Sequence, residues 1–246
     1  MATSKKNKEK LNFSDFKLET IVAELRYPFT FILWDVAGEL WHELEEKLPA
    51  KGFIITEASP ASVTVTYADK YEIGIQQERF VLNTSIPNVS LPEFFEILKV
   101  VFDLVTEKLQ IEVFNRIGFR QVFVKPYSNI KKAVADLRTL PSIQIPPQIL
   151  LGNENNYIAP GFSIRIEDGK KGKIFRLQAQ NRRFEISIPP QFVSEANDIP
   201  NVFTQSIIVF DIDSYTQVQT TVGQLSIVDW FKQAHATIVK DAEKFF

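Results

Sequence analysis

The sequence predicts an α+β fold in which two helix-backed antiparallel sheets are joined through long strands. Runs of alternating apolar and polar residues, typical of half-buried strands, come in groups of three, and segments with apolar residues at helical spacing separate the groups. The resulting order, β-α-βββ-α-β and then α-βββ-β-α, suggests two similar halves at residues 17–127 and 128–246, although no residue-level repeat is visible. The same order also fits one continuous domain.

The composition is that of a globular protein with one large domain or two small ones. Of the 246 residues, 45% are hydrophobic and 24% are charged, which leaves ample material for a core. The net charge of −2 gives no general attraction to nucleic acid or to an anionic membrane. The absence of cysteine excludes disulfides, thiolate metal sites and a cysteine nucleophile, and is compatible with a reducing compartment.

Residues 1–16 are predicted to form a disordered basic tail. The polar start of the chain, MATSKKNKEK, lacks the apolar stretch of a signal peptide, and no run is long enough to span a bilayer. A solvated tail is the simpler interpretation, and a phosphate-binding arm is the alternative. We therefore expect a cytoplasmic protein that makes no membrane contact.

The first half is predicted to contain a strand, a helix and a three-stranded meander. Residues 17–27 alternate as a strand, with Glu24 and Arg26 on its polar face, and Pro28 ends it. Residues 34–48 have the apolar spacing of an amphipathic helix. Clean alternation with short polar connections predicts the three strands of the meander at 61–67, 71–76 and 79–85.

The second predicted helix, residues 90–108, is apolar over most of its circumference. Ser90 is a capping residue, with Pro92 in the first turn and Glu93 three residues after the cap. Such a helix is buried on several sides, so it is either the central helix of the domain or part of a subunit interface. The interface candidates come from this helix and from the last one, and they are Phe94, Phe95, Phe231, His235 and Phe245.

A long strand at residues 111–125, bounded by Pro126, is the element around which the chain is organised. Because side chains alternate along a strand, Arg116 and Arg120 share one face, with a glycine between them. Two arginines on one face are unusual for a strand in the middle of an apolar chain.

The second half is predicted to repeat the mixture of helices and strands. A proline-rich linker at residues 140–157 and a turn centred on Asn181 separate its elements. These elements are a short helix at 130–137, a meander at 161–167, 173–180 and 182–189, a long strand at 203–215 and a final helix at 225–245.

Three predicted strands carry paired charges on one face, and these residues are the site candidates. They are Glu24 and Arg26, Arg116 and Arg120, and Asp211 and Asp213. If the strands are neighbours, opposite charges meet across the sheet and fix the strand register. In the alternative interpretation the face is a charged cleft, where the arginines hold an anionic ligand or the aspartates hold a divalent cation. Two carboxylates are a weak metal signature, so we assign no metal and no cofactor.

The sequence contains no recognised catalytic constellation. No second histidine follows His42 to complete a zinc motif, and His235 falls near the apolar stripe of the last helix, where a core or interface role is expected. No nucleophile elbow, phosphate-binding loop or dinucleotide fingerprint is present. With 9 glycines in the chain, a glycine-rich phosphate cradle is hard to build.

Several short motifs together resemble a sporadically distributed bacterial family of uncharacterised proteins of similar length. They are Glu24-Leu25-Arg26, Leu91-Pro92-Glu93-Phe94-Phe95, Asn115-Arg116-Ile117-Gly118-Phe119-Arg120, Asp211-Ile212-Asp213-x-Tyr215 and the final helix with His235. Members carry an R-I-G-L-R-Y-like strand and a late D-x-D-x-Y strand. Here Phe119 replaces the usual leucine and Gln121 the usual tyrosine. The patchy distribution of the family implies cargo of mobile genetic islands, such as phage defence or toxin–antitoxin systems.

We therefore expect a non-enzymatic protein that binds a protein partner as a homodimer. It would act as an accessory or sensor component of a bacterial conflict system. The alternative is an enzyme that uses the charged sheet face to bind a small anionic ligand or a metal. Nucleic-acid binding is the weakest hypothesis because the net charge is slightly negative.

Overall fold

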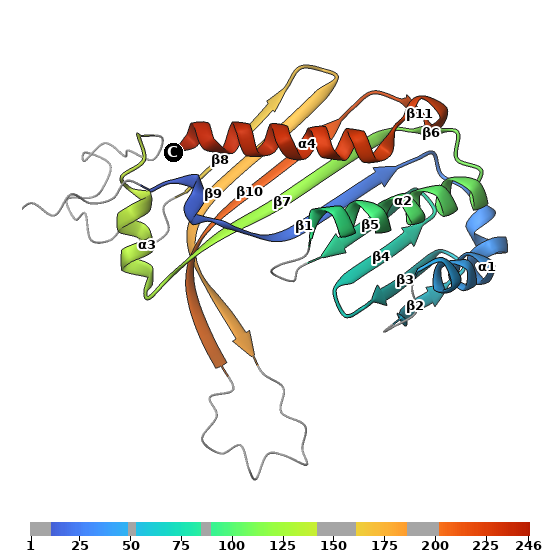
Figure 1. Ribbon diagram of the computed structural model, residues 1–246, viewed down its shortest axis with the longest axis horizontal. Coiled ribbons are helices and arrows are strands. Elements are labelled where there is room, and N and C mark those ends of the chain that lie inside the picture. The colour runs from blue at the N-terminus through green and yellow to red at the C-terminus, as the bar shows by residue number, and fades with distance from the viewer. Residues whose placement is uncertain (1–10, 49–52, 85–89, 142–160, 186–201) are drawn as a thin grey trace, which may run out of the picture.

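The computed structural model describes residues 11–48, 53–84, 90–141, 161–185 and 202–246 and places them around one large antiparallel sheet (Figure 1). The sheet has nine strands in the order β2-β3-β4-β5-β1-β7-β10-β9-β8, and β11 and β6 form a separate pair. Every pairing is antiparallel. The α+β class predicted from the sequence is confirmed.

The elements follow the predicted order closely. The helices are α1 (Ile32–Lys47), α2 (Leu91–Lys108), α3 (Ile130–Leu137) and α4 (Ile227–Ala242). The strands are β1 (Lys17–Arg26), β2 (Phe53–Ser59), β3 (Ser62–Tyr67), β4 (Tyr71–Gln76), β5 (Arg79–Thr84), β6 (Val113–Phe114), β7 (Arg116–Tyr127), β8 (Gly161–Glu167), β9 (Lys171–Glu185), β10 (Val202–Thr216) and β11 (Thr220–Thr221).

The two sheets expected from the sequence are two parts of one continuous sheet. β7 pairs with β1 on one side and with β10 on the other, so the long strands join the parts directly. The main hydrophobic core likewise runs through both parts and includes buried side chains of all four helices. Residues 17–127 and 128–246 therefore share one sheet and one core.

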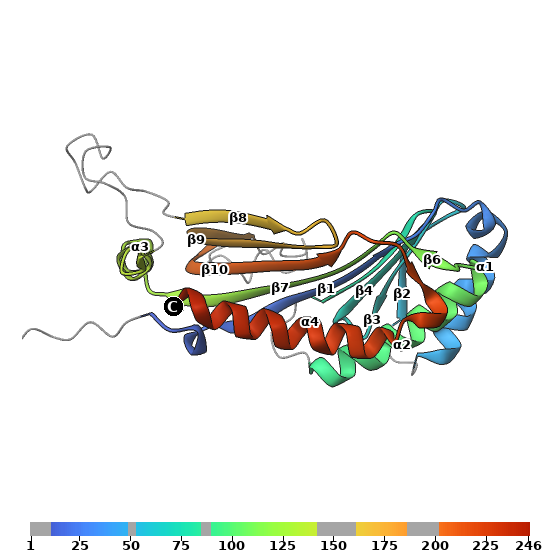
Figure 2. The same ribbon diagram turned by 90° about the horizontal axis from the view of Figure 1, so that it is seen from above.

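The helices of the described residues pack against one face of this sheet. Figures 1 and 2 show α1, α2 and α4 on the same side of it, with α3 near one end. On β1, the side chains that join the core are Ile21, Ala23 and Leu25, and the β7 partners of Ala23 and Leu25, Phe119 and Ile117, join it as well. We call the opposite face, which carries Glu24 and Arg26, the open face of the sheet.

The cap and the burial of α2 are those predicted. The Ser90 side chain accepts a hydrogen bond from the Glu93 N–H at 3.3 Å, and eight side chains of the helix are buried. Phe94 and Phe95 are among them, and both rings contact Phe119 of β7 at centroid distances of 6.4 and 6.3 Å. Of the two alternatives, the structure therefore supports the central helix.

Two predicted breaks in strands are wrong. Asn181 was expected in a turn, but β9 continues through it, and its side chain accepts a hydrogen bond from the Ser206 hydroxyl. Pro126 was expected to end the preceding strand, but it lies inside β7, opposite Ile207. It lies one residue before the end of that strand, where a missing N–H disturbs the ladder least.

The first residues and one strand also differ from expectation. Residues 11–16 are ordered around a short 3-10 helix at Phe13–Asp15, and Leu11 and Phe16 are buried in the core. Strand β2 was not predicted, because its side chains from Ile54 to Ala58 are exposed and give no alternation.

Several predictions fall outside the described residues: the tail before residue 11, most of the proline-rich linker and the end of the last predicted meander strand. Among the helices that are described, none combines the length and apolar character needed to cross a membrane.

Candidate functional site

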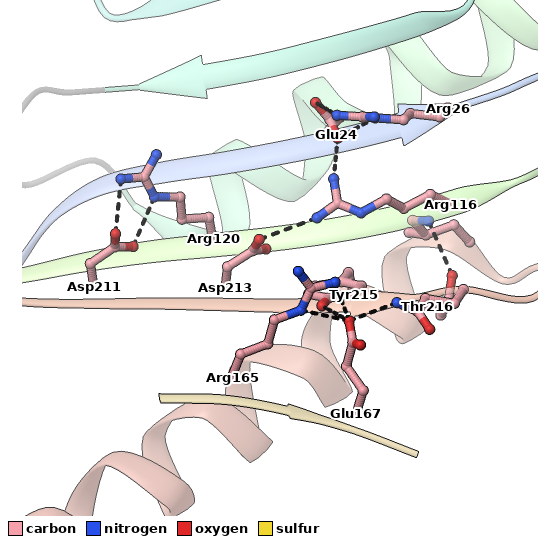
Figure 3. Close-up of polar contacts among 12 residues, drawn as sticks. Glu24, Arg26, Arg116, Arg120, Arg165, Glu167, Asp211, Asp213, Tyr215 and Thr216 are labelled. Carbon is pink, nitrogen blue, oxygen red and sulfur yellow. Dashed lines mark hydrogen bonds and ion pairs between the residues drawn. The ribbon is translucent and has the colours of Figure 1, made fainter. Parts of the chain in front are cut away.

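The six charged candidates lie together in the middle of the open face. Strands β1, β7 and β10 are neighbours, and their register places Arg26 opposite Arg116 and Arg120 opposite Asp213. Figure 3 shows two groups: Arg120 faces Asp211, and Arg116 lies between Asp213 and Glu24, which also contacts Arg26. The expectation that opposite charges meet across the sheet is confirmed.

Glu24 connects three arginines. It accepts hydrogen bonds from Arg26 Nε at 2.8 Å and from Arg116 Nη1, and Arg79 Nη1 lies 3.6 Å away. Burial by itself would raise the pKa of this carboxyl, but the Arg26 hydrogen bond and the three positive charges outweigh it and lower the pKa. Glu24 is therefore ionised over the physiological range.

Asp211 is the most deeply buried of the site carboxylates. Arg120 binds it with two hydrogen bonds, from Nε at 2.8 Å and Nη2 at 2.9 Å, and Arg176 of β9 adds a third at 3.0 Å. The Asp211 side chain is 8% exposed, whereas Arg120 and Arg176 are 49% and 44% exposed. Two half-exposed guanidinium groups thus cover one buried carboxylate.

Asp213 is held more weakly. One hydrogen bond joins it to Arg116 Nη2 at 3.2 Å, and its side chain is 17% exposed. Burial raises the pKa of Asp213, and the charges of Asp211 and Glu24 add to that effect, while Arg116 and Arg120 oppose it. Asp213 is thus harder to ionise than an aspartate in water.

These residues form what we call the arginine strip. It consists of the arginines Arg26, Arg79, Arg116, Arg120 and Arg176 and of the carboxylates Glu24, Asp211 and Asp213. Five guanidinium groups meet three carboxylates, so the strip has an excess of two positive charges. The carboxylates are less exposed than any of the arginines they bind. The exposed surface of the strip is therefore made of guanidinium groups.

An aromatic ring next to the strip holds Arg116 in place. The Arg116 guanidinium lies 4.6 Å from the centroid of the Tyr215 ring, and the Tyr215 hydroxyl donates to Glu167 Oε1 at 2.5 Å. A Cβ on Gly172 would lie 2.3 Å from Tyr215 Cζ, so the ring needs glycine beside it. Nearby, the Thr216 hydroxyl accepts from the Ile117 N–H across the strand end (Figure 3).

The interface candidates lie elsewhere. Phe94, Phe95 and Phe231 are buried in the core of this chain, so they do not form an exposed partner surface. Phe245 is partly buried against Phe175 and Phe210.

His235 faces β7 from α4. Its Nδ1 lies 3.0 Å from Oε1 of the fully buried Gln121, and burial lowers its pKa. Its contact with Gln121 places it between helix and sheet within this chain.

Two parts of the surface were not anticipated. Arg79 and Arg176 complete the strip, and only the strand register reveals them, since each faces its partner from a neighbouring strand. Phe29, Phe31 and Trp34 form an exposed cluster of edge-to-face rings, 54%, 63% and 54% exposed. We call these three residues the aromatic trio. Trp34 lies off the apolar stripe of α1. In the sequence, this position was the sign that the tryptophan would be exposed.

Comparisons with protein-family models and with curated proteins found no match for this chain. Within the residues that the structure describes, no group of three or more His, Cys, Asp or Glu side chains could hold a metal ion.

Proposed function

We propose that this chain is a non-enzymatic binding protein whose open sheet face recognises an acidic surface of a protein partner. The arginine strip carries the proposal, because five guanidinium groups lie over three less exposed carboxylates. Exposed arginines bind carboxylates with paired, charge-assisted hydrogen bonds. The strip therefore has the chemistry needed to bind glutamate and aspartate side chains.

The hydrogen bonds inside the strip do not use all the N–H donors of its arginines. A guanidinium group has about five N–H donors. Arg120 uses its Nε and Nη2 groups on Asp211, and Arg176 uses Nη1. Since both side chains are close to half exposed, their remaining donors can bind acceptors on a partner without breaking the internal bonds.

The width of the strip favours a protein segment over a single small anion. Its arginines come from β5, β1, β7 and β9, which spans four neighbouring strand spacings with β10 in between. Strands lie about 4.8 Å apart, so the strip is about 19 Å wide. An extended peptide of about six residues has that length.

The aromatic trio supports the same proposal. Its loop follows Arg26 directly and is bonded to the β4–β5 turn, where Thr30 N–H donates to the Gln77 carbonyl at 2.9 Å. The trio therefore lies at the end of the strip formed by Arg26 and Arg79. Exposed aromatic side chains beside arginines are the residue types that dominate protein interfaces.

The resemblance to a sporadically distributed bacterial protein family, whose patchy distribution suggests mobile genetic islands, extends the proposal to an accessory or sensor role in a bacterial conflict system. A homodimer also stays a prediction. The aromatic trio offers the exposed apolar surface for it, in place of the buried phenylalanines of α2 and α4.

Binding of a fluorescent glutamate peptide of about ten residues, measured by anisotropy, tests the proposed function. We expect binding that weakens as salt is added, because exposed charges are screened. Arg120→Gln with Arg176→Gln should weaken it about tenfold or more, since at least one charge-assisted hydrogen bond is lost. Lys232→Gln with Lys240→Gln on α4 removes the same charge and should leave binding unchanged. Equal binding by both double variants would refute the proposal.

A small anionic ligand is the second candidate, favoured by the same excess of two positive charges. Nucleotides or anionic metabolites would then raise the melting temperature of the wild type and not that of the Arg120→Gln, Arg176→Gln variant. The carboxylates of the strip are already bonded to guanidinium groups, so its geometry does not support the metal-dependent version of this hypothesis.

A further inference from the structure

A cavity of about 490 Å³ lies away from the arginine strip, between the β8–β9 hairpin and the end of α4. Hairpin residues from Ile166 to Phe175 line one side, and Asp241, Lys244 and Phe245 line the other. Its volume is within the range of small-molecule sites, about 300–1,000 Å³. No part of the proposed partner binding uses it.

The inner part of the cavity is apolar and held firmly. Phe175 is buried, and its ring centroid is 4.9 Å from that of Phe245. Phe245 in turn packs against Phe162 and Phe210, both at 5.5 Å. Ile166 adds an exposed apolar side chain at the opening. Such a lining favours a hydrocarbon or aromatic group over water.

The rim of the cavity is positively charged. Its three ammonium groups belong to Lys171, Lys173 and Lys244, and its two carboxylates belong to Asp168 and Asp241. Asp241 is paired with both Lys173 and Lys244. Burial by itself would raise the Asp241 pKa, but these two hydrogen bonds outweigh it and lower the pKa.

The second carboxylate of the rim, Asp168, also has hydrogen-bond partners within the chain. Asp168 accepts hydrogen bonds from the backbone N–H groups of Lys170 and Lys171, at 2.9 and 2.8 Å, and so closes the hairpin turn. Within the described part of the chain the Lys171 ammonium makes no salt bridge, and its charge is one of the causes that lower the pKa of Asp168. Lys171 is therefore placed to bind an anion at the edge of an apolar cavity.

We propose that this cavity binds an amphipathic monocarboxylate, such as a medium-chain fatty acid. Its hydrocarbon part lies against Ile166, Phe175 and Phe245, and its carboxylate pairs with Lys171. Both halves of the ligand are needed, because the apolar lining provides affinity and the ammonium group selects the acid.

Displacement of the fluorescent probe 1-anilinonaphthalene-8-sulfonate by decanoate tests this inference on the full chain. Decanoate should displace the probe, and decan-1-ol, which lacks the charge, should do so about tenfold less well, since a charge-assisted hydrogen bond is lost. Ile166→Glu places a negative charge at an exposed position of the lining and should abolish decanoate binding. Lys171→Gln should weaken it about tenfold, while the neighbouring Lys170→Gln should not.

Three outcomes would overturn the inference. They are no displacement by decanoate in the wild type, equal displacement by decanoate and decan-1-ol, and unchanged decanoate binding in Ile166→Glu. Circular dichroism of each variant shows that a loss of binding is not a loss of fold. Arg120→Gln should bind decanoate like the wild type, which separates this site from the arginine strip.

Discussion

At the residue scale, the arginine strip depends most on Asp211. This carboxylate is buried and has two arginine partners, so either one can neutralise it. A buried charge that loses all its partners is strongly destabilising, whereas the loss of one half-exposed partner is not. The strip thus tolerates single changes at its surface while its buried charges hold the strands in register.

Replacing Arg120 and Arg176 by leucine should reveal this coupling. Each single variant should lower the free energy of unfolding by about 1 kcal/mol, because the other arginine still pairs with Asp211. The double variant should lower it by about 3 kcal/mol or more, since Asp211 is then unpaired. Urea unfolding of the wild type, the two single variants and the double variant measures these free energies. A double-variant effect equal to the sum of the two single effects would contradict the shared pairing with Asp211.

Glu24 should make stability depend on pH in a defined direction. Its folded pKa is lowered below the unfolded value of about 4.3, so its contribution is present above about pH 4 and is lost as the pH falls through the folded pKa. Glu24→Gln should therefore be less stable than the wild type at neutral pH, and the difference should shrink below about pH 4. Urea unfolding of both proteins from neutral pH to below about pH 4 measures this difference. A stability difference that does not change with pH would count against the ion pairs of Glu24.

The two glycines near Arg116 should respond differently to alanine. A Cβ on Gly172 would lie 2.3 Å from Tyr215 Cζ, whereas a Cβ on Gly118 would lie 3.5 Å from Arg116 Cζ. Gly172→Ala should therefore destabilise the fold by about 1–3 kcal/mol, and Gly118→Ala should change stability by less than about 0.5 kcal/mol. Thermal unfolding of the two variants distinguishes them, and equal effects would contradict the packing of Tyr215 on Gly172.

At the element scale, the sequence predicted those elements whose side chains divide cleanly between core and solvent. The cap and apolar surface of α2 and the alternation of β3, β4 and β5 are of this kind. Strand β2 was missed because it is an edge strand with exposed side chains. The break predicted at Asn181 was wrong because its side chain binds Ser206 on β10, and a sequence does not show that partner.

The burial of α2 gives a prediction about its role. Phe94→Ala should lower the free energy of unfolding by about 3–5 kcal/mol, because the ring is fully buried among core side chains. Phe31→Ala removes the same ring from an exposed position and should have an effect below about 0.5 kcal/mol. Urea unfolding measures both. A small effect at Phe94, together with a change in oligomeric state by light scattering, would restore the interface interpretation.

At the scale of the whole molecule, the register of the central strands decides what the site is. The sequence predicted which residues share a face, and so it identified Glu24, Arg116, Arg120 and Asp211 as candidates. It could not predict that β1, β7 and β10 are neighbours, because strand order depends on long-range pairing. Arg79 and Arg176 were missed for the same reason.

The continuous sheet should unfold as one unit. Trp34→Phe with Trp41→Phe leaves Trp230 of α4 as the fluorescent reporter, while Trp230→Phe leaves the two tryptophans of α1. Because both ends of the sheet share one core, each reporter should follow the unfolding of the whole molecule. In each variant, the urea transition measured by tryptophan fluorescence should coincide with the transition measured by circular dichroism. Separate transitions for the two reporters would indicate two independent domains.

The most direct test of the arginine strip is to observe its guanidinium groups while an acidic peptide binds. In ¹⁵N-labelled protein, the Nε–Hε signals of Arg120 and Arg176 should shift during titration with the glutamate peptide, because these half-exposed groups form the surface of the strip. Backbone signals of α2 and α4, on the other face, should stay in place. Shifts confined to those helices, or binding without any change at Arg120 and Arg176, would contradict the proposed function.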